Sequence, residues 1–286
     1  MKPLIDGDVL LYEIGFCGEY RDEYGELQIR EWEFVRELLD QRIAQICEAV
    51  FNTQPPTIYL NSSEKLVKQW NRIYPDRVLY HTPNFRIDLA TKKGYKAQRK
   101  EGKPFHYNNI GAYLLANYDV KLAIGMESDD LMSIDQTKAA STGDTIICSR
   151  DKDLKQVPGM HYSWPCGKQQ EFGPALIDEL GSIEVVKGKI VGGGLKFFYS
   201  QVLTGDAVDN IPGLPKYGPV KAYTLLHDCR SERELFEVCQ TAYMSVYGEG
   251  WKKEMLEQCQ LLWMIRELDE NQNPIMYKLM EIIERE

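Results

Sequence analysis

The residues best suited to chemistry in this chain are carboxylates that gather in short acidic motifs. Glu127, Asp129 and Asp130 fall within four positions, directly after the apolar run from 120 to 124. Like charges this close repel one another, and burying them is unfavourable unless a cation compensates. Carboxylate oxygens are the ligands that Mg²⁺ and Mn²⁺ prefer. An acidic first turn also suits a helix N-terminus, so this motif alone leaves a structural role open.

Three further acidic motifs also follow apolar segments. Asp6-Gly7-Asp8 comes after Leu4-Ile5, Asp151-Lys152-Asp153 comes after the run 145–148, and Gly205-Asp206 begins a motif that ends at Asp209. The carboxyl ends of parallel strands meet at one edge of an α/β sheet, where such folds place their sites. We therefore predict a metal site at that edge. The candidate metal ligands are Asp6, Glu127, Asp129, Asp130, Asp151, Asp153, Asp206 and Asp209.

The order of these motifs resembles the 5′ nuclease family, which includes flap endonucleases, the 5′-exonuclease domains of bacterial DNA polymerase I and phage 5′–3′ exonucleases. The resemblance also rests on the segments 95–99 and 212–214, and it extends from residue 6 to about residue 226. It implies a PIN-like fold, hydrolysis of DNA phosphodiesters from the 5′ side, and two Mg²⁺ or Mn²⁺ ions. The phage enzymes are the most similar, which implies a role in phage DNA replication or recombination. A flap endonuclease preference and cleavage of RNA in hybrids stay open.

The resemblance also suggests how the ligands divide between two ions. It places Asp6, Glu127 and Asp129 nearer one ion and Asp151, Asp153 and Asp209 nearer the other, with Asp130 and Asp206 acting through waters. The chain departs from the family after the second predicted strand, where many members carry an aspartate and this sequence has Asn61-Ser62-Ser63. We expect either more waters on one ion or a replacement ligand such as Asp88.

The most basic stretch lies between residues 91 and 103 and has one acid, Glu101. A solvated basic helix is the structural alternative, but aromatic residues interleave with the cations, as in proteins that bind single strands. In the family this region forms a helical arch beside which the single-stranded 5′ end passes. On such a helix Lys96 and Arg99 share a face, and the resemblance implies that both contact the scissile phosphate as catalytic residues. The candidate DNA-binding residues here are Lys92, Lys93, Tyr95 and Lys100.

A second DNA contact is predicted after Asn210. Glycines there permit a tight turn with close backbone approach, and a helix that begins at Gly218 or Pro219 would direct N–H groups at a phosphate. The segment resembles the family's helix-three-turn-helix, which implies contact with the duplex backbone and a K⁺ ion. The candidate residues are Gly213, Lys216, Gly218 and Lys221.

The elements that position these residues follow from the hydrophobic pattern. Apolar runs predict strands at 2–5, 57–60, 78–81, 120–124, 145–148 and 160–164, and residues 11–30 form a polar, hairpin-like connection. Helical spacing predicts helices over 31–51, from 64, and over 107–119, 129–140, 195–203, 231–247 and 250–268. The predicted fold is α/β, with a mainly parallel sheet flanked by helices. We expect a nuclease core over 1–190, with the arch near 91–107, and a helical C-terminal region over 191–286.

The composition restricts the class of protein. The 286 residues carry a formal net charge of −9, which argues against indiscriminate DNA coating but not against a nuclease whose acids are neutralised by metal. Seven scattered cysteines without a zinc-ligand spacing indicate reduced thiols. With no membrane-length apolar run and no signal-peptide pattern, we expect a cytoplasmic, monomeric protein that acts on DNA carrying a 5′ end or a 5′ flap.

Other functions share part of this pattern. The motifs at Asp6 and Asp206 also resemble those of haloacid-dehalogenase-type phosphatases, but that class expects Thr or Val where Leu10 stands and leaves Glu127 and Asp151 unexplained. A nuclease-dead DNA-binding module would account for the absence of the second-strand aspartate. An RNA-cleaving PIN-like ribonuclease is disfavoured by the predicted duplex-binding motif.

Overall fold

The structure is a computed structural model that describes residues 1–98 and 102–279. The chain divides into two compact units. The first contains residues 1–84, 102–151 and 159–176, and the second contains residues 85–98, 152–158 and 177–279. The C-terminal region expected from residue 191 lies in the second unit, which also takes in earlier parts of the chain. In the described residues, no helix is long and apolar enough to cross a membrane.

Among the described residues, the first unit has a six-stranded sheet at its centre. Its strands lie in the order β5-β4-β1-β6-β7-β8. The pairings from β5 through β7 are all parallel. The predicted fold class, an α/β fold with a mainly parallel sheet, is therefore confirmed. Its strands are β1 (Lys2–Asp6), β4 (Thr57–Asn61), β5 (Asp119–Ala123), β6 (Thr145–Cys148), β7 (Gly159–Ser163) and β8 (Phe172–Ile177).

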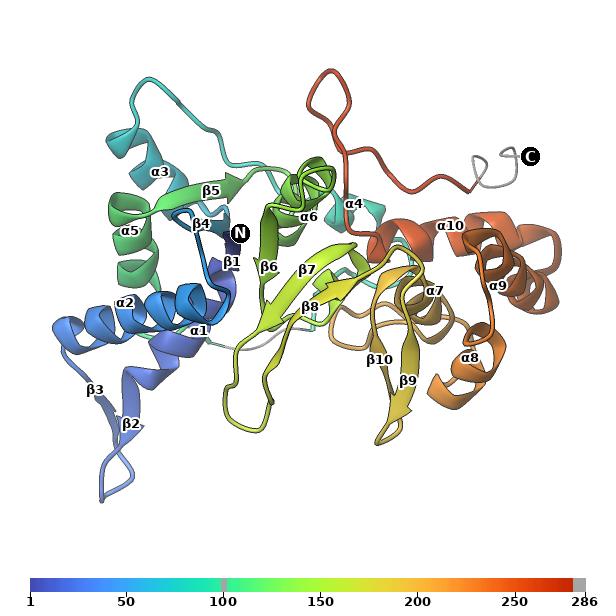
Figure 1. The fold of residues 1–286 in the computed structure, drawn as a ribbon, viewed down its shortest axis with the longest axis horizontal. Coiled ribbons are helices and arrows are strands. Elements are labelled where there is room, and N and C mark those ends of the chain that lie inside the picture. The colour runs from blue at the N-terminus through green and yellow to red at the C-terminus, as the bar shows by residue number, and fades with distance from the viewer. Residues whose placement is uncertain (99–101, 280–286) are drawn as a thin grey trace. The chain divides into compact units, whose positions relative to one another are not determined.

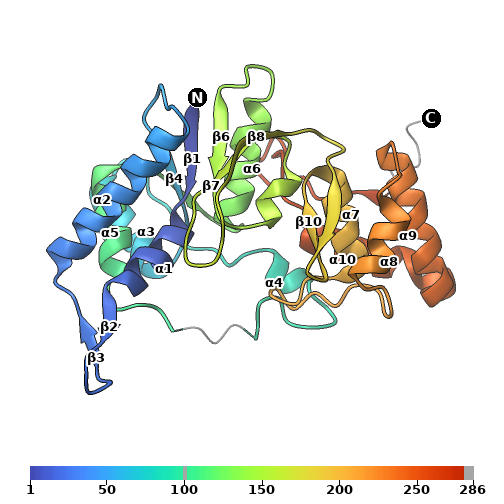
Figure 2. The same cartoon turned by 60° about the horizontal axis from the view of Figure 1, so that its bottom comes forward.

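Helices cover both faces of this sheet (Figures 1 and 2). Successive strand residues face opposite ways, so Ile5 and Ile58 join the core made with α1, α2, α3 and α5, while Leu4 and Tyr59 lie outside that core. The Tyr59 hydroxyl instead donates a 2.5 Å hydrogen bond to Asp135 of α6. The helices are α1 (Gly7–Cys17), α2 (Trp32–Ala49), α3 (Glu64–Ile73), α5 (Tyr107–Asn117) and α6 (Ser128–Lys138).

The second unit is mainly helical and has a core of its own. Phe198 and Val202 of α7 pack with Leu235 of α9 and with Met255 and Cys259 of α10. The unit also holds an antiparallel hairpin of β9 (Ile183–Val186) and β10 (Lys189–Gly192), which the hydrophobic pattern did not predict. Its helices are α4 (Arg86–Leu89), η1 (Asp153–Gln156), α7 (Gly194–Thr204), α8 (Pro219–Leu226), α9 (Glu232–Tyr247), η2 (Gly248–Gly250) and α10 (Trp251–Leu262).

The predicted connection over 11–30 is wrong in its first part. Residues up to Cys17 continue α1, because Leu10, Leu11 and Ile14 are all buried on one side of that helix. The hairpin-like remainder is confirmed as β2 (Glu19–Arg21) paired with β3 (Leu27–Ile29).

The strand predicted at 78–81 is also wrong. The side chain of Asn71 forms hydrogen bonds with both backbone groups of Leu79, accepting from its N–H at 2.8 Å and donating to its carbonyl at 2.9 Å. A residue satisfied in this way needs no strand partner.

The predicted helical arch is wrong for the part of 91–106 that the structure describes, which forms bends and turns. Lys96 has a φ of +53°, a left-handed conformation that interrupts a helix. Tertiary contacts hold this backbone instead: Thr91 N–H donates to Glu257 at 2.9 Å and Lys96 N–H donates to the Asp209 carbonyl at 3.1 Å. Arg99 and Lys100 lie outside the described residues.

Candidate metal and DNA sites

Several polar residues of the first unit lie at one edge of the parallel sheet. Glu127 follows β5, Asn61 ends β4, Asp6 ends β1, and Ser149 and Asp151 follow β6. These strands are neighbours and all run in the same direction, so their carboxyl ends meet at this edge. The first-unit carboxylates that the sequence singled out therefore belong to one sheet edge.

Asp6 is the most deeply placed of these acids, with 3% of the residue exposed. Its Oδ1 accepts a hydrogen bond from Val9 N–H at 3.1 Å, which caps α1, and its Oδ2 accepts one from the Ser149 hydroxyl at 2.6 Å. Burial, together with the charges of Asp8 and Asp151, raises the pKa of Asp6 to about 7, against these two hydrogen bonds. A divalent cation would offset both the unfavourable burial of negative charge and the repulsion between the carboxylates. This set of oxygen donors therefore fits such an ion.

Asp8 and Asn61 connect this edge to the start of α6. Asp8 Oδ2 accepts from the Asn61 backbone N–H at 2.8 Å and from the Ser128 hydroxyl at 2.8 Å. Asn61 Oδ1 in turn accepts from the Ser128 backbone N–H at 2.9 Å, which satisfies one of the open donors of the helix N-terminus. The sequence motif contained Asp8, but only Asp6 was predicted as a ligand. Asn61 and Ser128 carry no charge, so only their contacts reveal a role.

The acidic motif before α6 divides into different roles. Asp130 is fully buried, and its Oδ2 accepts from the Glu127 backbone N–H at 3.0 Å. This contact closes the first turn of α6, the structural role that the motif left open. Glu127 is 9% exposed and Asp129 is half-buried. Across residues 1–98 and 102–279, no three His, Cys, Asp or Glu side chains are gathered as a ready-made metal-binding group.

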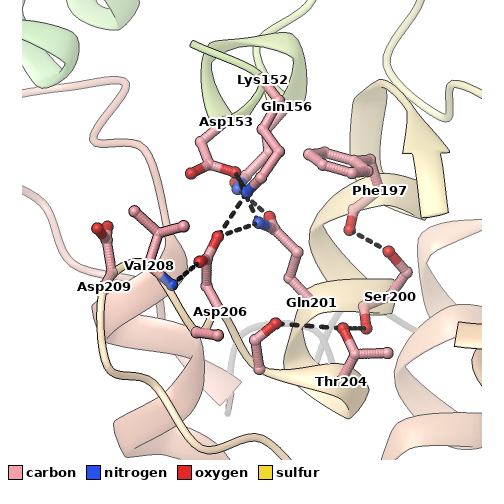
Figure 3. Close-up of polar contacts among 12 residues, drawn as sticks. Lys152, Asp153, Gln156, Phe197, Ser200, Gln201, Thr204, Asp206, Val208 and Asp209 are labelled. Atoms are coloured by element: carbon pink, nitrogen blue, oxygen red, sulfur yellow. Dashed lines mark hydrogen bonds and ion pairs between the residues drawn. The ribbon is translucent and has the colours of Figure 1, made fainter. Parts of the chain in front are cut away.

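Two other predicted ligands lie in the second unit and are bridged by a lysine (Figure 3). Lys152 Nζ lies 2.7 Å from Asp153 Oδ1 and 2.5 Å from Asp206 Oδ2. Gln201 Nε2 donates to the same two oxygens, at 2.6 and 3.3 Å. Gln156 Nε2 donates to Gln201 Oε1 at 2.7 Å and fixes which end of that amide faces the acids. The structure therefore brings Asp153 and Asp206 together around an ammonium group.

This bridge sets the protonation of both partners. Burial alone would raise the pKa of Asp206, but the hydrogen bond and the charge of Lys152 outweigh it and hold that pKa below its ordinary value. Burial alone would lower the pKa of Lys152, but Asp153 and Asp206 outweigh burial and raise that pKa. Lys152 and Asp206 are consequently both charged at neutral pH.

Asp209 is held by the segment that precedes the undescribed residues. The Tyr95 hydroxyl donates to Asp209 Oδ2 at 3.2 Å, and Lys96 Nζ lies 3.7 Å from the same oxygen. The structure thus places the predicted catalytic lysine beside a predicted metal ligand, both within the second unit. Lys92, by contrast, forms an ion pair with Glu254, and Lys93 is exposed.

The loop between α7 and α8 holds the other predicted DNA contacts. Gly213 has a φ of +64°, and an added Cβ would lie 2.2 Å from the Gly205 nitrogen, so this glycine is required by the fold itself. Gly218 caps α8, and no atom lies within 4 Å of where its Cβ would be. Lys216 is exposed in the turn, and Lys221 Nζ lies 3.4 Å from the centre of the Tyr217 ring. The predicted start of α8 is confirmed.

Sequence comparison finds relatives of two kinds, while no family model matches the chain. DNA polymerase I of Rhizobium leguminosarum is 36% identical over 157 residues, which make up 52% of this chain and 14% of that protein. Flap endonuclease Xni of Shewanella amazonensis is 26% identical over 201 residues, which make up 69% of this chain and 70% of that protein. The chain thus spans about a seventh of the length of the polymerase.

Structure comparison matches the chain to two solved structures from T5. The D15 protein co-crystallised with metal ions gives a TM-score of 0.48 at 13% identity and covers 91% of this chain and 98% of its own. The 5′-exonuclease with bound zinc gives a TM-score of 0.47 at 13% identity and covers 92% of this chain and 99% of its own.

Proposed function

We propose that this chain, whose sequence relatives confirm its resemblance to the 5′ nuclease family, is a metal-dependent phosphodiesterase that cuts DNA from a 5′ end. The observation that supports this most directly is the set of carboxylates at the ends of adjacent parallel strands. Asp6 ends β1 and Asp151 follows the neighbouring strand β6, and burial and repulsion hold the pKa of Asp6 far above the ordinary value for an aspartate. Such a group favours a cation, and the site lies where α/β folds bind their ligands.

In this proposal Asp6, Glu127 and Asp129 hold one divalent ion, Mg²⁺ or Mn²⁺. Asp151, which the resemblance placed nearer the other ion, is assigned to this one because its charge acts on Asp6. The ion would supply a more acidic bound water and stabilise negative charge on the phosphate. The protein's own contribution is to fix the donors. Ser149 and the start of α1 orient the carboxylate of Asp6, and Asp130 orders the backbone that carries Glu127.

A second ion is proposed for the carboxylates of the second unit. Asp153 and Asp209 would be its ligands, with Asp206 acting through water. Lys152 neutralises part of this charge and holds Asp153 and Asp206 in one place. Because Asp153 and Asp206 are already held in place, less conformational entropy is lost when a ligand binds to them.

DNA would be held by two parts of the second unit. Lys96, together with Arg99, is proposed to contact the scissile phosphate, and in the structure Lys96 lies beside Asp209. The N-terminus of α8 carries backbone N–H groups suited to a duplex phosphate, and Gly218 leaves space for close approach. Lys216 and Lys221 add positive charge next to it, and a K⁺ ion is proposed at this turn.

The proposed substrate is duplex DNA with a 5′ end or a 5′ flap, cleaved by a monomer in phage DNA replication or recombination, in the host cytoplasm. Product sizes from a 5′-labelled flap and from a 5′-labelled blunt duplex, each with Mg²⁺ or with EDTA, test the proposal. Metal-dependent release of short 5′ products is expected from one or both substrates. Failure to cut either DNA in Mg²⁺ or Mn²⁺, or undiminished cutting in EDTA, would contradict it.

A further inference from the structure

The carboxylate of Asp8 lies at the end of β4, although Asp8 belongs to α1. It accepts a hydrogen bond from the backbone N–H of Asn61, the last residue of β4, at 2.8 Å. The same oxygen accepts from the Ser128 hydroxyl at 2.8 Å. Asp8 thus stands against the residue where the resemblance leads one to expect an aspartate.

Asn61 itself does not replace that aspartate. Its side chain is neutral, and its Oδ1 is engaged by the Ser128 backbone N–H at 2.9 Å. The hydroxyl of Ser62 lies 3.1 Å from His81 Nδ1, so it also has another partner. The alternative considered from the sequence, Asp88, lies exposed on α4 in the second unit.

Asp8 also belongs electrostatically to the proposed metal edge. Burial is the largest cause that raises the pKa of Asp6, and the charge of Asp8 is the next largest. It likewise raises the pKa of Tyr107, after burial. Through its contacts with Asn61 and Ser128, the Asp8 carboxylate lies at the sheet edge where β4 ends and α6 begins, beside the residue that stands between Glu127 and Asp129.

We propose that Asp8 is a metal ligand of this chain, and that it replaces the second-strand aspartate from the first turn of α1. The carboxylate comes from α1 instead of β4, and its hydrogen bonds with Asn61 and Ser128 hold it against the end of β4. This inference rests on the proposed function, because it names one more ligand of the same metal site.

Moving the carboxylate back tests this directly. Asp8→Asn keeps an oxygen that can accept from Asn61 N–H and from Ser128, but it removes the charge. Asn61→Asp restores a carboxylate at the strand end while keeping an acceptor for the Ser128 N–H. Binding of Mn²⁺ would be measured by electron paramagnetic resonance of the free ion, for both single variants and for the double variant, with folding checked by circular dichroism in EDTA.

Asp8→Asn should weaken Mn²⁺ binding at least about tenfold, since even groups that only support metal ligands are worth about 10–100-fold in affinity. The double variant should recover most of the affinity, because the carboxylate returns to the same place. Asn61→Asp alone should lower stability in EDTA through repulsion with Asp8. Asp144→Asn, an exposed acid just before β6, is the matched control and should bind Mn²⁺ like the unchanged protein.

The outcomes separate this inference from the proposed function. If Asp6→Asn and Asp151→Asn weaken Mn²⁺ binding while Asp8→Asn does not, Asp8 is not a ligand and only this inference fails. A folded double variant with the affinity of Asp8→Asn would likewise overturn it, because the two positions would not be equivalent. If neither Asp6→Asn nor Asp151→Asn changes Mn²⁺ binding, the metal site of the proposed function itself is wrong.

Discussion

The ammonium group of Lys152 lies 2.5 Å from the carboxylate of Asp206, and the same nitrogen lies 2.7 Å from Asp153. Asp206 is 6% exposed, so its charge depends on this partner more than a surface acid would. The lysine is thus the cation that joins η1 to the loop after α7. This arrangement leads to the first prediction.

Lys152→Gln should destabilise the protein in EDTA by about 1.5–3 kcal/mol, the range for a hydrogen bond to a charged group, because Gln201 and Val208 still donate to Asp206. The ion pair contributes stability above the ordinary aspartate pKa of 3.8 and loses it as the pH falls through the lowered pKa of Asp206. The difference between variant and unchanged protein should therefore shrink in acid. Urea unfolding at pH 7 and at low pH measures this, with Lys189→Gln, an exposed lysine on β10, as control. Equal effects of both substitutions would contradict the bridge.

The second prediction concerns pH and Asp6. Its pKa is raised from 3.8 to about 7 in the folded protein, so the native state keeps this proton where the unfolded chain has lost it. The resulting stability is fully present below pH 3.8 and is lost as the pH rises to about 7. Each unit of pKa difference corresponds to about 1.4 kcal/mol.

In EDTA, the free energy of unfolding of Asp6→Asn should therefore fall less steeply between pH 4 and pH 7 than that of the unchanged protein. Denaturant titrations across that range provide the measurement, with Asp144→Asn as the matched control. Parallel pH profiles for Asp6→Asn and the unchanged protein would show that Asp6 does not carry this proton.

The sequence predicted well those features that depend on local pattern. Asp6 follows a buried strand and Glu127 precedes a helix, so the hydrophobic pattern alone was enough to place both at a sheet edge. The hairpin after α1 and the start of α8 follow from turn residues and from Gly218-Pro219.

Features that depend on distant contacts could not be predicted in this way. The run at 78–81 is apolar like a strand, but the Asn71 side chain on α3 forms hydrogen bonds with both backbone groups of Leu79. The basic segment reads as a helix, but Glu257 and Asp209 hold its backbone in turns. The lysine bridge and the contact of Asp8 with Asn61 join residues far apart in the chain, and no local periodicity encodes such a pairing.

The third prediction separates the two glycines of the loop before α8. Gly218→Val should reduce affinity for duplex DNA while destabilising the protein by at most about 1 kcal/mol, the effect of a poor helix cap, because open space surrounds its Cβ position. Gly213→Val should instead destabilise the fold, because its Cβ would collide with the Gly205 backbone. Thermal unfolding and fluorescence anisotropy with a duplex measure the two effects. Loss of duplex binding only in parallel with unfolding in Gly218→Val would contradict a direct DNA contact.

The fourth prediction concerns Lys96. Lys96→Ala should slow cleavage under single-turnover conditions far more than it weakens duplex binding, because its proposed contact strengthens in the transition state. Lys93→Ala removes an exposed charge from the same segment and is the control, with a modest effect on binding alone. If Lys96→Ala lowers binding but leaves the rate at saturating DNA unchanged, the lysine only attracts DNA.

The central claim is that the carboxylate edge of the parallel sheet is a catalytic metal centre, and Asp151→Asn tests it most directly. This substitution keeps the size of the side chain and removes one negative charge next to Asp6. The cleavage rate on a 5′-labelled substrate in saturating Mg²⁺ should fall at least about a thousandfold, which corresponds to about 4 kcal/mol of lost transition-state stabilisation, while the fold and DNA affinity in EDTA stay unchanged. A variant that folds, binds DNA and cleaves it at nearly the original rate would contradict the assignment of this edge as the catalytic centre.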